Sequence, residues 1–202
     1  MPFYPMQDIL VMMNGRNDLM KTLILNGSPR RNGDTVSLLD ILKDGLDSEV
    51  TQIDAYYADI APCNDCRACR VHDGCVVDDD MSEIYRLLPD ADNIVIASPI
   101  YFSEITGRLL DVCSRLQTYY SARFFRGERI VFKPKKGAVI LVGGGDGSGE
   151  RADETSRCIL MHMGCKSYFP TVLSHNTNNI PAAEDKAAVE AVKSLAHWLS
   201  ES

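Results

Sequence analysis

Short apolar runs alternate along the chain with longer stretches whose apolar residues recur at helical spacing. The short runs end in turns that contain glycine, proline or polar residues, which is typical of buried strands. They lie at residues 21–26, 49–55, 93–98, 137–142 and 166–173. Because strands that alternate with helices pair in parallel and are covered on both faces, the pattern predicts an α/β fold with one parallel sheet.

Helices are predicted between and after these strands, over residues 34–46, 80–88, 106–120, 150–163 and 182–199. Asp34 is expected to cap the first helix, and Asp80 with Glu83 resembles a capping box at the start of the second. Gly164 is expected to end the fourth helix, and Pro181 suits the first turn of the fifth. Five strands and five helices at this length predict a flavodoxin-like three-layer sandwich with strand order 2-1-3-4-5.

Length and charge place the chain among ordinary globular proteins. Its 202 residues suit one domain, which we expect at residues 21–202 behind an N-terminal extension at 1–20. The formal net charge of -7 argues against nucleic acid and anionic membranes as partners. The extension lacks a basic start and a small-residue cleavage site, so we expect no signal peptide and a cytoplasmic protein with reduced thiols.

Four cysteines fall within the segment CNDCRACRVHDGC at 63–75. Cys63, Cys66 and Cys69 are each separated by two residues, a spacing that suits three corners of a [4Fe-4S] cluster. Cys75 is the natural fourth ligand, because the sequence offers no second set of clustered cysteines. Three alternatives remain open: a structural zinc site, disulfides, and metal-free thiols. A structural zinc site more often draws on two separate cysteine pairs.

The segment GSPRRNGDT at 27–35 joins the first predicted strand to the first predicted helix. Backbone N–H groups at a helix N-terminus favour an anion, and Gly27 and Gly33 let a ligand approach the backbone. Ser28 and Thr35 offer hydroxyl donors, and Arg30 can pair with a phosphate. The segment lacks the GK[ST] element of a P-loop and is not a GxGxxG turn, so we predict a phosphate site of another kind.

This segment resembles the GSPR-x-x-GNT signature of the NAD(P)H-dependent FMN reductase family of flavodoxin-like proteins. The segment ASPIYF at 97–102, followed by ITG at 105–107, is similar to the family's SP-x-Y-x loop, whose backbone lies beside the flavin ring. The resemblance covers residues 21–200 and implies an FMN-dependent oxidoreductase. It implies that FMN is bound by Ser28, Arg30, Asp34 and Thr35 in the first loop and by Pro99, Ile100, Tyr101 and Phe102 in the second.

A third loop, GGGDGSG at 143–149, follows the fourth predicted strand. Glycine-rich backbone lets amide groups face a planar ring, although a flexible turn has the same composition. Because ligands bind at the edge where parallel strands have their carboxyl ends, we expect this loop to lie beside the other two. We therefore predict that the flavin is contacted by Gly143, Gly144, Gly145 and Asp146.

The cysteine segment resembles the compact motif of the iron-sulfur flavoproteins, a branch of the same family. This resemblance implies that a [4Fe-4S] cluster and FMN exchange electrons across a subunit interface, so we expect a homodimer or homotetramer. A redox partner or a small electron acceptor would complete the reaction. The alternative functions are an NAD(P)H-dependent FMN or quinone reductase with incidental cysteines, and a flavodoxin-like electron carrier.

The remaining residues have less specific patterns. His72 suits a surface position better than a metal site, and His175 follows the last predicted strand, close to the expected ligand edge. Cys113 and Cys158 lie in predicted helices and are expected in the core. Contact with a neighbouring subunit or with substrate and buried packing are equally suited to Tyr119, Tyr120, Phe124 and Phe125. Contacts with a neighbouring chain are also expected from Phe3, Tyr4, Ile9 and Leu10. The sequence shows no Ser-His-Asp or paired-carboxylate pattern, as expected where a flavin supplies the redox chemistry.

Overall fold

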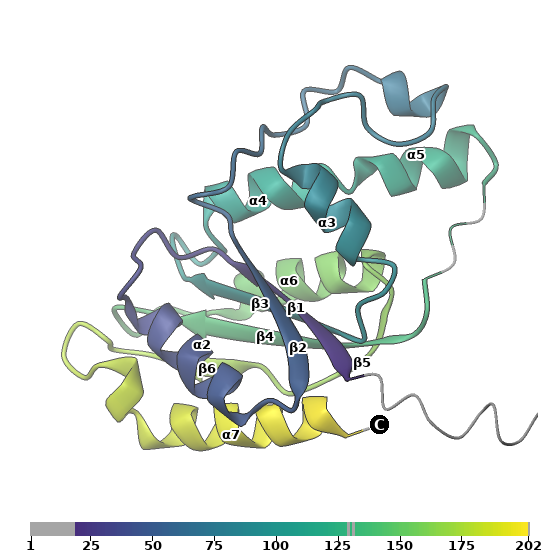
Figure 1. The fold of residues 1–202 in the computed structure, drawn as a ribbon. Coiled ribbons are helices and arrows are strands. Elements are labelled where there is room, and N and C mark those ends of the chain that lie inside the picture. Colours follow the sequence, from purple (N-terminus) through teal and green to yellow (C-terminus); the bar gives the residue numbers. More distant parts are fainter. Residues whose placement is uncertain (1–18, 129, 131, 202) are drawn as a thin grey trace, which may run out of the picture.

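The computed structural model describes residues 19–128, 130 and 132–201. Its strands are β1 Met20–Asn26, β2 Ser48–Asp54, β3 Asn93–Pro99, β4 Lys135–Val142, β5 Cys165–Tyr168 and β6 Val172–Ser174. They form one parallel sheet in the order β2-β1-β3-β4-β5, and β6 also pairs with β4 (Figure 1). The prediction of a flavodoxin-like α/β fold is confirmed. The N-terminal residues expected to contact a neighbouring chain, Phe3, Tyr4, Ile9 and Leu10, lie outside the described residues.

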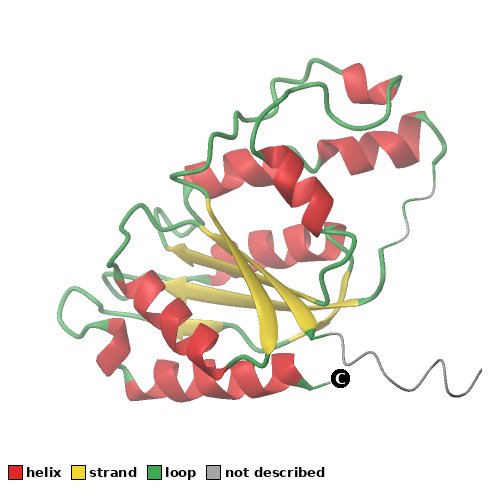
Figure 2. Cartoon of the chain, viewed as in Figure 1, coloured by secondary structure: helices red, strands yellow, loops and turns green. Residues whose placement is uncertain are grey.

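The helices are α2 Asp34–Gly45, α3 Met81–Leu87, α4 Gly107–Ser114, α5 Gln117–Phe125, α6 Glu150–His162 and α7 Lys186–Ser200, with short 3-10 helices η1 Ala68–Arg70 and η2 Ala182–Glu184. They cover both faces of the sheet (Figure 2). α2 and α7 pack on one face, over a core that includes Ile24 and Val95, and α3, α4 and α6 pack on the other, over Leu23 and Ile96. Neighbouring residues of a strand thus enter opposite cores, as the two-residue repeat of a strand requires.

The last predicted strand, at 166–173, is split in the structure. β5 pairs with residues 135–137 of β4, whereas β6 pairs with residues 140–142. Pro170 lies between the two short strands, and a proline has no N–H to donate to the sheet. As a consequence, β6 ends beside the loop that follows β4.

The predicted helix at 106–120 is also broken, into α4 and α5. The break falls at Arg115 and Leu116, where the carbonyl of Arg115 accepts a hydrogen bond from the Tyr85 hydroxyl at 2.8 Å. In a continuous helix this carbonyl would accept the N–H of Tyr119, which instead donates to Leu116 at 3.0 Å. A tertiary contact therefore ends α4, and α5 continues alongside the cysteine segment (Figure 1).

Two helix starts differ from the sequence predictions in their capping contacts. α2 is capped by Gly33 rather than by Asp34, and no side chain in the described part of the protein bonds to this cap. Asp80 is the N-cap residue of α3, as predicted, but its side chain makes no capping hydrogen bond, and the Asp79 carboxylate instead accepts the N–H of Met81 at 3.1 Å. The capping box predicted for α3 is therefore wrong.

α7 begins later than predicted and is held at both ends. Pro181 precedes η2, and α7 starts after Asp185, whose carboxylate accepts the first N–H groups of the helix. At the other end, the Lys136 ammonium donates to the carbonyls of Trp198 and Glu201, both at 2.6 Å. These contacts complement the partial charges of the two helix ends.

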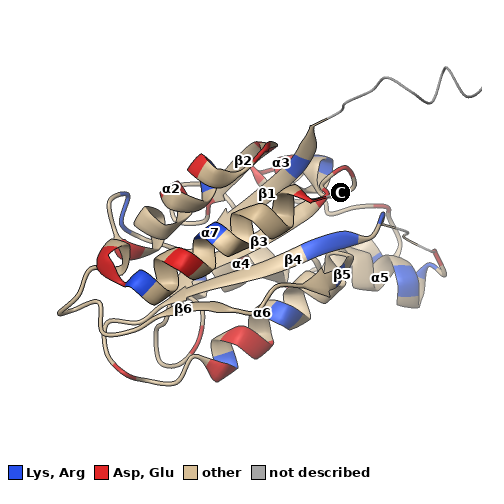
Figure 3. Cartoon of the chain, turned by 90° about the horizontal axis from the view of Figure 1, so that it is seen from below, with Lys and Arg blue, Asp and Glu red and all other residues tan. Residues whose placement is uncertain are grey.

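Acidic and basic residues are interspersed on the helices that lie below the sheet (Figure 3).

Lys135, at the start of β4, is buried, and its ammonium donates to the carbonyls of Pro89 and Ala91 at 3.2 and 2.8 Å. Burial lowers the pKa of Lys135 below its ordinary value. Across the described ranges, every helix is too short or too polar to span a bilayer.

Candidate functional site

The loops that follow β1, β3 and β4 lie together at one edge of the sheet, on the left in Figure 1. Parallel strands have their carboxyl ends here, and ligands bind at this edge in such folds. A fourth loop, after β6, joins the three loops that sequence analysis identified. Its N–H groups donate to the third loop in three pairs, Asn176 to Gly145, Thr177 to Gly143 and Asn178 to Gly144.

The first loop is fixed against the start of α4. The N–H of Gly27 donates to Ala97 at 2.7 Å, and its carbonyl accepts the Thr106 hydroxyl at 2.9 Å. A Cβ at Gly27 would lie 2.8 Å from the Thr106 oxygen, so a larger residue does not fit. The hydroxyl of Ser28 accepts the N–H of Arg30 at 3.2 Å. The loop is therefore shaped by its own contacts and its neighbours.

The two arginines of this loop have different surroundings. Arg31 lies over the ring of Tyr57, with its guanidinium carbon 3.8 Å from the ring centroid. Arg30 is exposed and lies beside the start of α2, because a Cβ at Gly33 would be 3.2 Å from its Nε. An exposed guanidinium next to a helix N-terminus suits a phosphate.

Asp34 and Thr35, the other predicted ligands of the first loop, lie in the first turn of α2. Thr35 is buried. The carboxylate of Asp34 accepts the N–H of Ala182 at 3.0 Å, and its other oxygen lies 3.5 Å from the Arg30 guanidinium. Asp34 therefore joins α2 to η2, and its contact with a cofactor stays a prediction.

The second loop contains two residues with left-handed backbone. Phe102 has a φ of 53° and Ser103 a φ of 63°, a conformation that costs energy for residues with a side chain. Tyr101 and Glu104 exchange two backbone hydrogen bonds across this turn, at 2.8 and 3.0 Å. The Glu104 carboxylate is held in turn by the Thr155 hydroxyl at 2.8 Å. The turn presents the rings of Tyr101 and Phe102 to solvent.

Ile100 connects the second loop to the third. It follows Pro99, the last residue of β3, and its Cδ1 lies 3.3 Å from the position of a Cβ at Gly149. His175 lies on the other side, with its Nδ1 atom 3.1 Å from the position of a Cβ at Gly143. This buried Nδ1 has no hydrogen-bond partner among the described residues. The tip of the third loop is more open and contains Gly144, Gly145 and Asp146.

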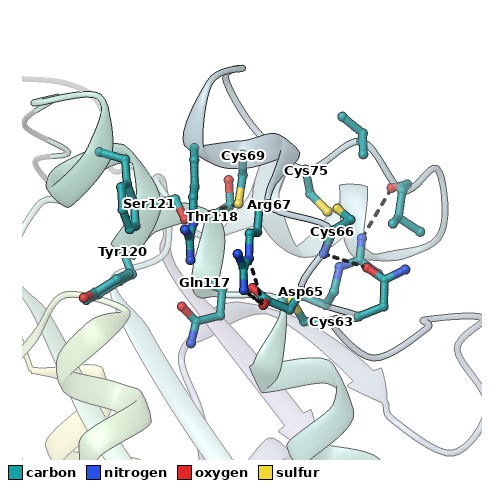
Figure 4. A pocket seen from close by; sticks show the side chains of 16 residues that line it. Cys63, Asp65, Cys66, Arg67, Cys69, Cys75, Gln117, Thr118, Tyr120 and Ser121 are labelled. Carbon is teal, nitrogen blue, oxygen red and sulfur yellow. Dashed lines mark hydrogen bonds and ion pairs between the residues drawn. The ribbon is translucent and has the colours of Figure 1, made fainter.

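The four cysteines of the motif line one pocket of about 70 Å³ (Figure 4). Left-handed backbone at Asp65 places a turn between Cys63 and Cys66, and left-handed backbone at Arg67 places another between Cys66 and Cys69. α5 forms the opposite wall, where the Ser121 hydroxyl lies 3.2 Å from the Cys69 sulfur. The cysteines in this pocket are Cys63, Cys66, Cys69 and Cys75.

A buried arginine joins the two ends of the cysteine segment. Arg115 is 2% exposed, and its Nη1 donates to the carbonyl of Ala61 at 2.8 Å and to Asp79 at 2.6 Å. Its Nη2 donates to the carbonyl of Val77 at 3.3 Å. Burial alone would lower the pKa of Arg115, but the hydrogen bond to Asp79 and the nearby Cys75 thiol raise it above its ordinary value. Arg115 thus fixes the backbone before and after the four cysteines.

A second arginine holds the middle of the segment. Arg126 uses Nη1 to donate to the carbonyls of Cys69 and His72, the latter at 2.9 Å. Its Nη2 donates to Asp73 at 3.1 Å and its Nε to Glu128 at 2.7 Å. The backbone of the segment is therefore held from both ends of α5, while the side chain of His72 is exposed, as predicted. Nothing in the local sequence identifies these two arginines as partners of the motif.

The cysteine pocket has the ligand chemistry of a metal–sulfur site, since four thiols share it. Among the described residues, however, no three His, Cys, Asp or Glu side chains are gathered closely enough to hold a metal ion. All seven cysteines lie in the described part of the chain and carry free thiols. The structure therefore brings the motif cysteines to one pocket without closing them into a ligand set.

The three cysteines outside the motif lie away from this pocket. Burial raises the pKa of the Cys113 thiol and of the Cys165 thiol to about 12, which makes both unreactive. Cys113 is thus a core residue, as predicted. Cys158 is exposed on α6, so its predicted core position is wrong.

An exposed aromatic patch borders the cysteine pocket on α5. It consists of Tyr120, Phe124 and Phe125, which are 46%, 60% and 51% exposed. Tyr120 and Phe124 are stacked with ring centroids 4.3 Å apart, and the guanidinium of Arg70 lies 4.3 Å from the ring centre of Phe125. Tyr119 instead packs inward against other rings. The aromatic run therefore supplies both buried packing and an exposed apolar surface.

The fold and the loops at its carboxyl edge define a flavodoxin-like, FMN-dependent oxidoreductase. A sequence model of the NADPH-dependent FMN reductase family matches residues 20–179. The chain is 30% identical over 191 residues to the iron-sulfur flavoprotein of Methanosarcina thermophila, covering 89% of this chain and 93% of that relative. An iron-sulfur flavoprotein of Archaeoglobus fulgidus is 31% identical over 65% of this chain and 58% of its own length. The chain therefore belongs to the NADPH-dependent FMN reductase family, in its iron-sulfur flavoprotein branch.

Solved structures of other oxidoreductases share the fold. An NAD(P)H:quinone oxidoreductase from Methanothermobacter marburgensis has a TM-score of 0.69 at 18% identity, covering 91% of this chain and 99% of that chain. An FMN-dependent NADH-azoreductase from Bacillus anthracis, in complex with FMN, has a TM-score of 0.62 at 18% identity, covering 91% of this chain and 100% of that chain. At these identities the likeness establishes the common architecture.

Proposed function

We propose that the protein holds FMN in the three loops that follow β1, β3 and β4, called the carboxyl-edge loops below, and a [4Fe-4S] cluster in the cysteine pocket. We further propose that electrons pass between the two. The observation that carries this proposal is that all four motif cysteines line a single pocket. Four thiolates are the ligand set of such a cluster. FMN when bound takes electrons in pairs or singly and the cluster takes them singly, so together they connect two-electron with one-electron partners.

Each carboxyl-edge loop has a separate task in this proposal. Arg30, the hydroxyls of Ser28 and Thr35 and the N-terminus of α2 bind the FMN phosphate. The flavin ring lies between the other two loops, of which the one after β4 is rich in glycine. The ring contacts are the residues expected from sequence, Pro99, Ile100, Tyr101, Phe102, Gly143, Gly144, Gly145 and Asp146.

Within one chain, α4 separates the two sites. Its start contacts the first loop through Thr106 and Gly27, and at its end the Ser114 hydroxyl accepts the N–H of Cys63 at 2.9 Å. The eight residues of α4 span about 12 Å. We therefore include a second chain in the proposal, docked through the aromatic patch of α5 so that its flavin lies near this chain's cysteine pocket. Closed symmetry then gives a homodimer or homotetramer.

Single cysteine-to-serine variants test the cluster. Wild-type protein prepared without oxygen should contain about four irons, the content of one such cluster, and one FMN per chain. In each cysteine-to-serine variant the iron content should fall while FMN stays bound, because the phosphate loop lies at the other end of α4. Cys158→Ser is the matched control, since this exposed thiol lies on α6. A wild-type protein without iron, or equal iron loss in the control, would contradict the proposal. The test variants are Cys63→Ser, Cys66→Ser, Cys69→Ser and Cys75→Ser.

An NAD(P)H-dependent FMN or quinone reductase is the second candidate. It is favoured by the exposed rings of Tyr101 and Phe102, which leave the ring site accessible to a nicotinamide or a quinone. Stopped-flow reduction of the flavin by NADH and NADPH distinguishes the two functions. Fast reduction that is unaffected by Cys66→Ser would favour the reductase, whereas transfer onward to a one-electron acceptor that requires Cys66 would favour the first proposal.

A further inference from the structure

Arg115 carries one hydrogen-bond donor that its structural contacts do not use. Its Nη1 and Nη2 groups hold the two ends of the cysteine segment, but its buried Nε has no hydrogen-bond partner among the described residues. An unsatisfied buried donor costs about 1–3 kcal/mol, so a protein rarely keeps one without a reason. Arg115 is also part of the wall of the pocket that the four cysteines line.

Arg126 shows that the unsatisfied donor is particular to Arg115. Both arginines hold the same segment, and both donate to backbone carbonyls within or beside it. In Arg126, however, the Nε donates to Glu128 at 2.7 Å, and both terminal nitrogens are engaged. Holding the backbone therefore does not by itself leave an Nε without a partner.

We propose that the Nε–H of Arg115 donates a hydrogen bond to a sulfur atom of the metal cluster held by the four motif cysteines, and that this bond raises the reduction potential of the cluster. The inference rests on the proposed function, because it needs a cluster in the pocket. Cys63 and Cys75 are the cysteines on the Arg115 side, since Ala61 and Val77, each two residues away from one of them, accept hydrogen bonds from Arg115 at 2.8 and 3.3 Å. One-electron reduction adds negative charge to the cluster, and a directed N–H stabilises the reduced form more than the oxidised form. Hydrogen bonds to the sulfurs are among the features that set the potential of such clusters.

The geometry of the side chains supplies a direct test. Arg115→Lys places a methylene where the arginine has Nε, while its ammonium can still reach Asp79. We expect this variant to keep iron and FMN and to shift the cluster potential downward by about 59 mV, a tenfold change in a one-electron equilibrium. Arg126→Lys is the control, because it loosens the same segment without removing an unpaired Nε. It should lower iron retention and leave the potential unchanged.

A second pair of variants separates the role of the Nε–H from the contacts by which Arg115 holds the cysteine segment. The two double variants are Asp79→Asn with Arg115→Gln and Asp79→Asn with Arg115→Met. Both lack the ion pair, and both have the same net charge. Glutamine places an amide N–H near the position of the arginine Nε, whereas methionine places a methyl group there. We expect the glutamine variant to have the higher cluster potential of the two, with FMN potentials that are equal.

Spectroelectrochemical titration of the anaerobic proteins, with iron and FMN analysis of each sample, gives the result. The inference is overturned by an unchanged potential in iron-loaded Arg115→Lys, by equal shifts in the Arg115→Lys and Arg126→Lys variants, or by equal potentials in the glutamine and methionine pair. Loss of iron from every Arg115 variant, with iron kept in Arg126→Lys, would also overturn it, because Arg115 would then only hold the segment. Wild-type protein that binds no iron would instead refute the proposed function.

Discussion

At the scale of single residues, the adjacent arginines of the first loop differ in what their guanidinium groups contact. Arg30→Ala should weaken FMN binding by roughly 1.5–3 kcal/mol, because a charge-assisted contact with the phosphate is lost. Arg31→Ala should leave FMN binding close to wild type, since Arg31 is stacked on Tyr57. Fluorescence titration of the apoprotein with FMN measures both. Equal losses in the two variants would show that Arg30 has no special role.

Asp79 predicts how stability depends on pH. Burial raises the pKa of this carboxyl, but the hydrogen bonds from Arg115 and from the N–H groups of Ala61 and Met81 outweigh burial and lower it below its ordinary value. A carboxyl with a lowered pKa in the folded state contributes stability above its unfolded value of about 3.9 and loses it as the pH falls through the folded value.

Asp79→Asn tests this contribution. At neutral pH the variant should lose about 3–5 kcal/mol of unfolding free energy, because Arg115 stays buried without its anionic partner. The difference from wild type should shrink as the pH falls from about 4, where Asp79 of the unfolded chain becomes protonated, through the lower pKa that Asp79 has in the folded protein. Urea unfolding at a series of pH values measures it, and a difference that stays constant with pH would contradict the assignment.

At the scale of elements, the second loop stores backbone strain at Ser103. Ser103→Gly should raise the unfolding free energy by roughly 0.5–1 kcal/mol, because glycine adopts positive φ without steric cost but loses more entropy on folding. Ser103→Ala is the control and should give no such gain, since its Cβ keeps the strain. Chemical denaturation of the two variants decides, and a glycine variant that is less stable than the alanine variant would argue against a strained turn.

The elements that could be predicted from sequence are those defined by local pattern. The central strands and the helices 34–45 and 150–162 follow from apolar spacing, and parallel order follows from their alternation. The breaks in the predicted helix at 106–120 and in the predicted strand at 166–173 depend on features that the spacing of apolar residues does not contain. Tyr85 must reach the carbonyl of Arg115 to end α4, and a proline must interrupt the edge strand.

The site was predictable where it lies in contiguous motifs, and not where distant residues complete it. The first loop and the cysteine segment are each one short stretch of sequence, so their residues can be identified by chemistry and spacing. Arg115 lies 36 residues from Asp79, and Arg126 lies 57 residues from Cys69. Arg115 lies at the break between α4 and α5, and the sequence pattern at 106–120 does not show this break.

At the scale of the whole molecule, the aromatic patch of α5 predicts self-association. Wild-type protein should sediment as a dimer or tetramer at micromolar concentration, because an exposed cluster of aromatic rings beside the cysteine pocket is typical of an interface. The double variant Phe124→Ser with Phe125→Ser should dissociate it. Met161→Ser, at an exposed apolar residue of α6, is the control. A monomeric wild type, or association unaffected by the double variant, would remove the proposed contact between one chain's cysteines and another chain's flavin.

Anomalous diffraction at the iron edge, from crystals grown without oxygen, tests most directly whether the cysteine segment holds a cluster. We expect an iron peak inside the pocket bounded by Cys63, Cys66, Cys69 and Cys75, with FMN in the three carboxyl-edge loops of the same crystal. FMN in these loops together with a cysteine pocket free of iron, or an iron peak outside this pocket, would contradict the proposal that the chain couples a cluster to its flavin.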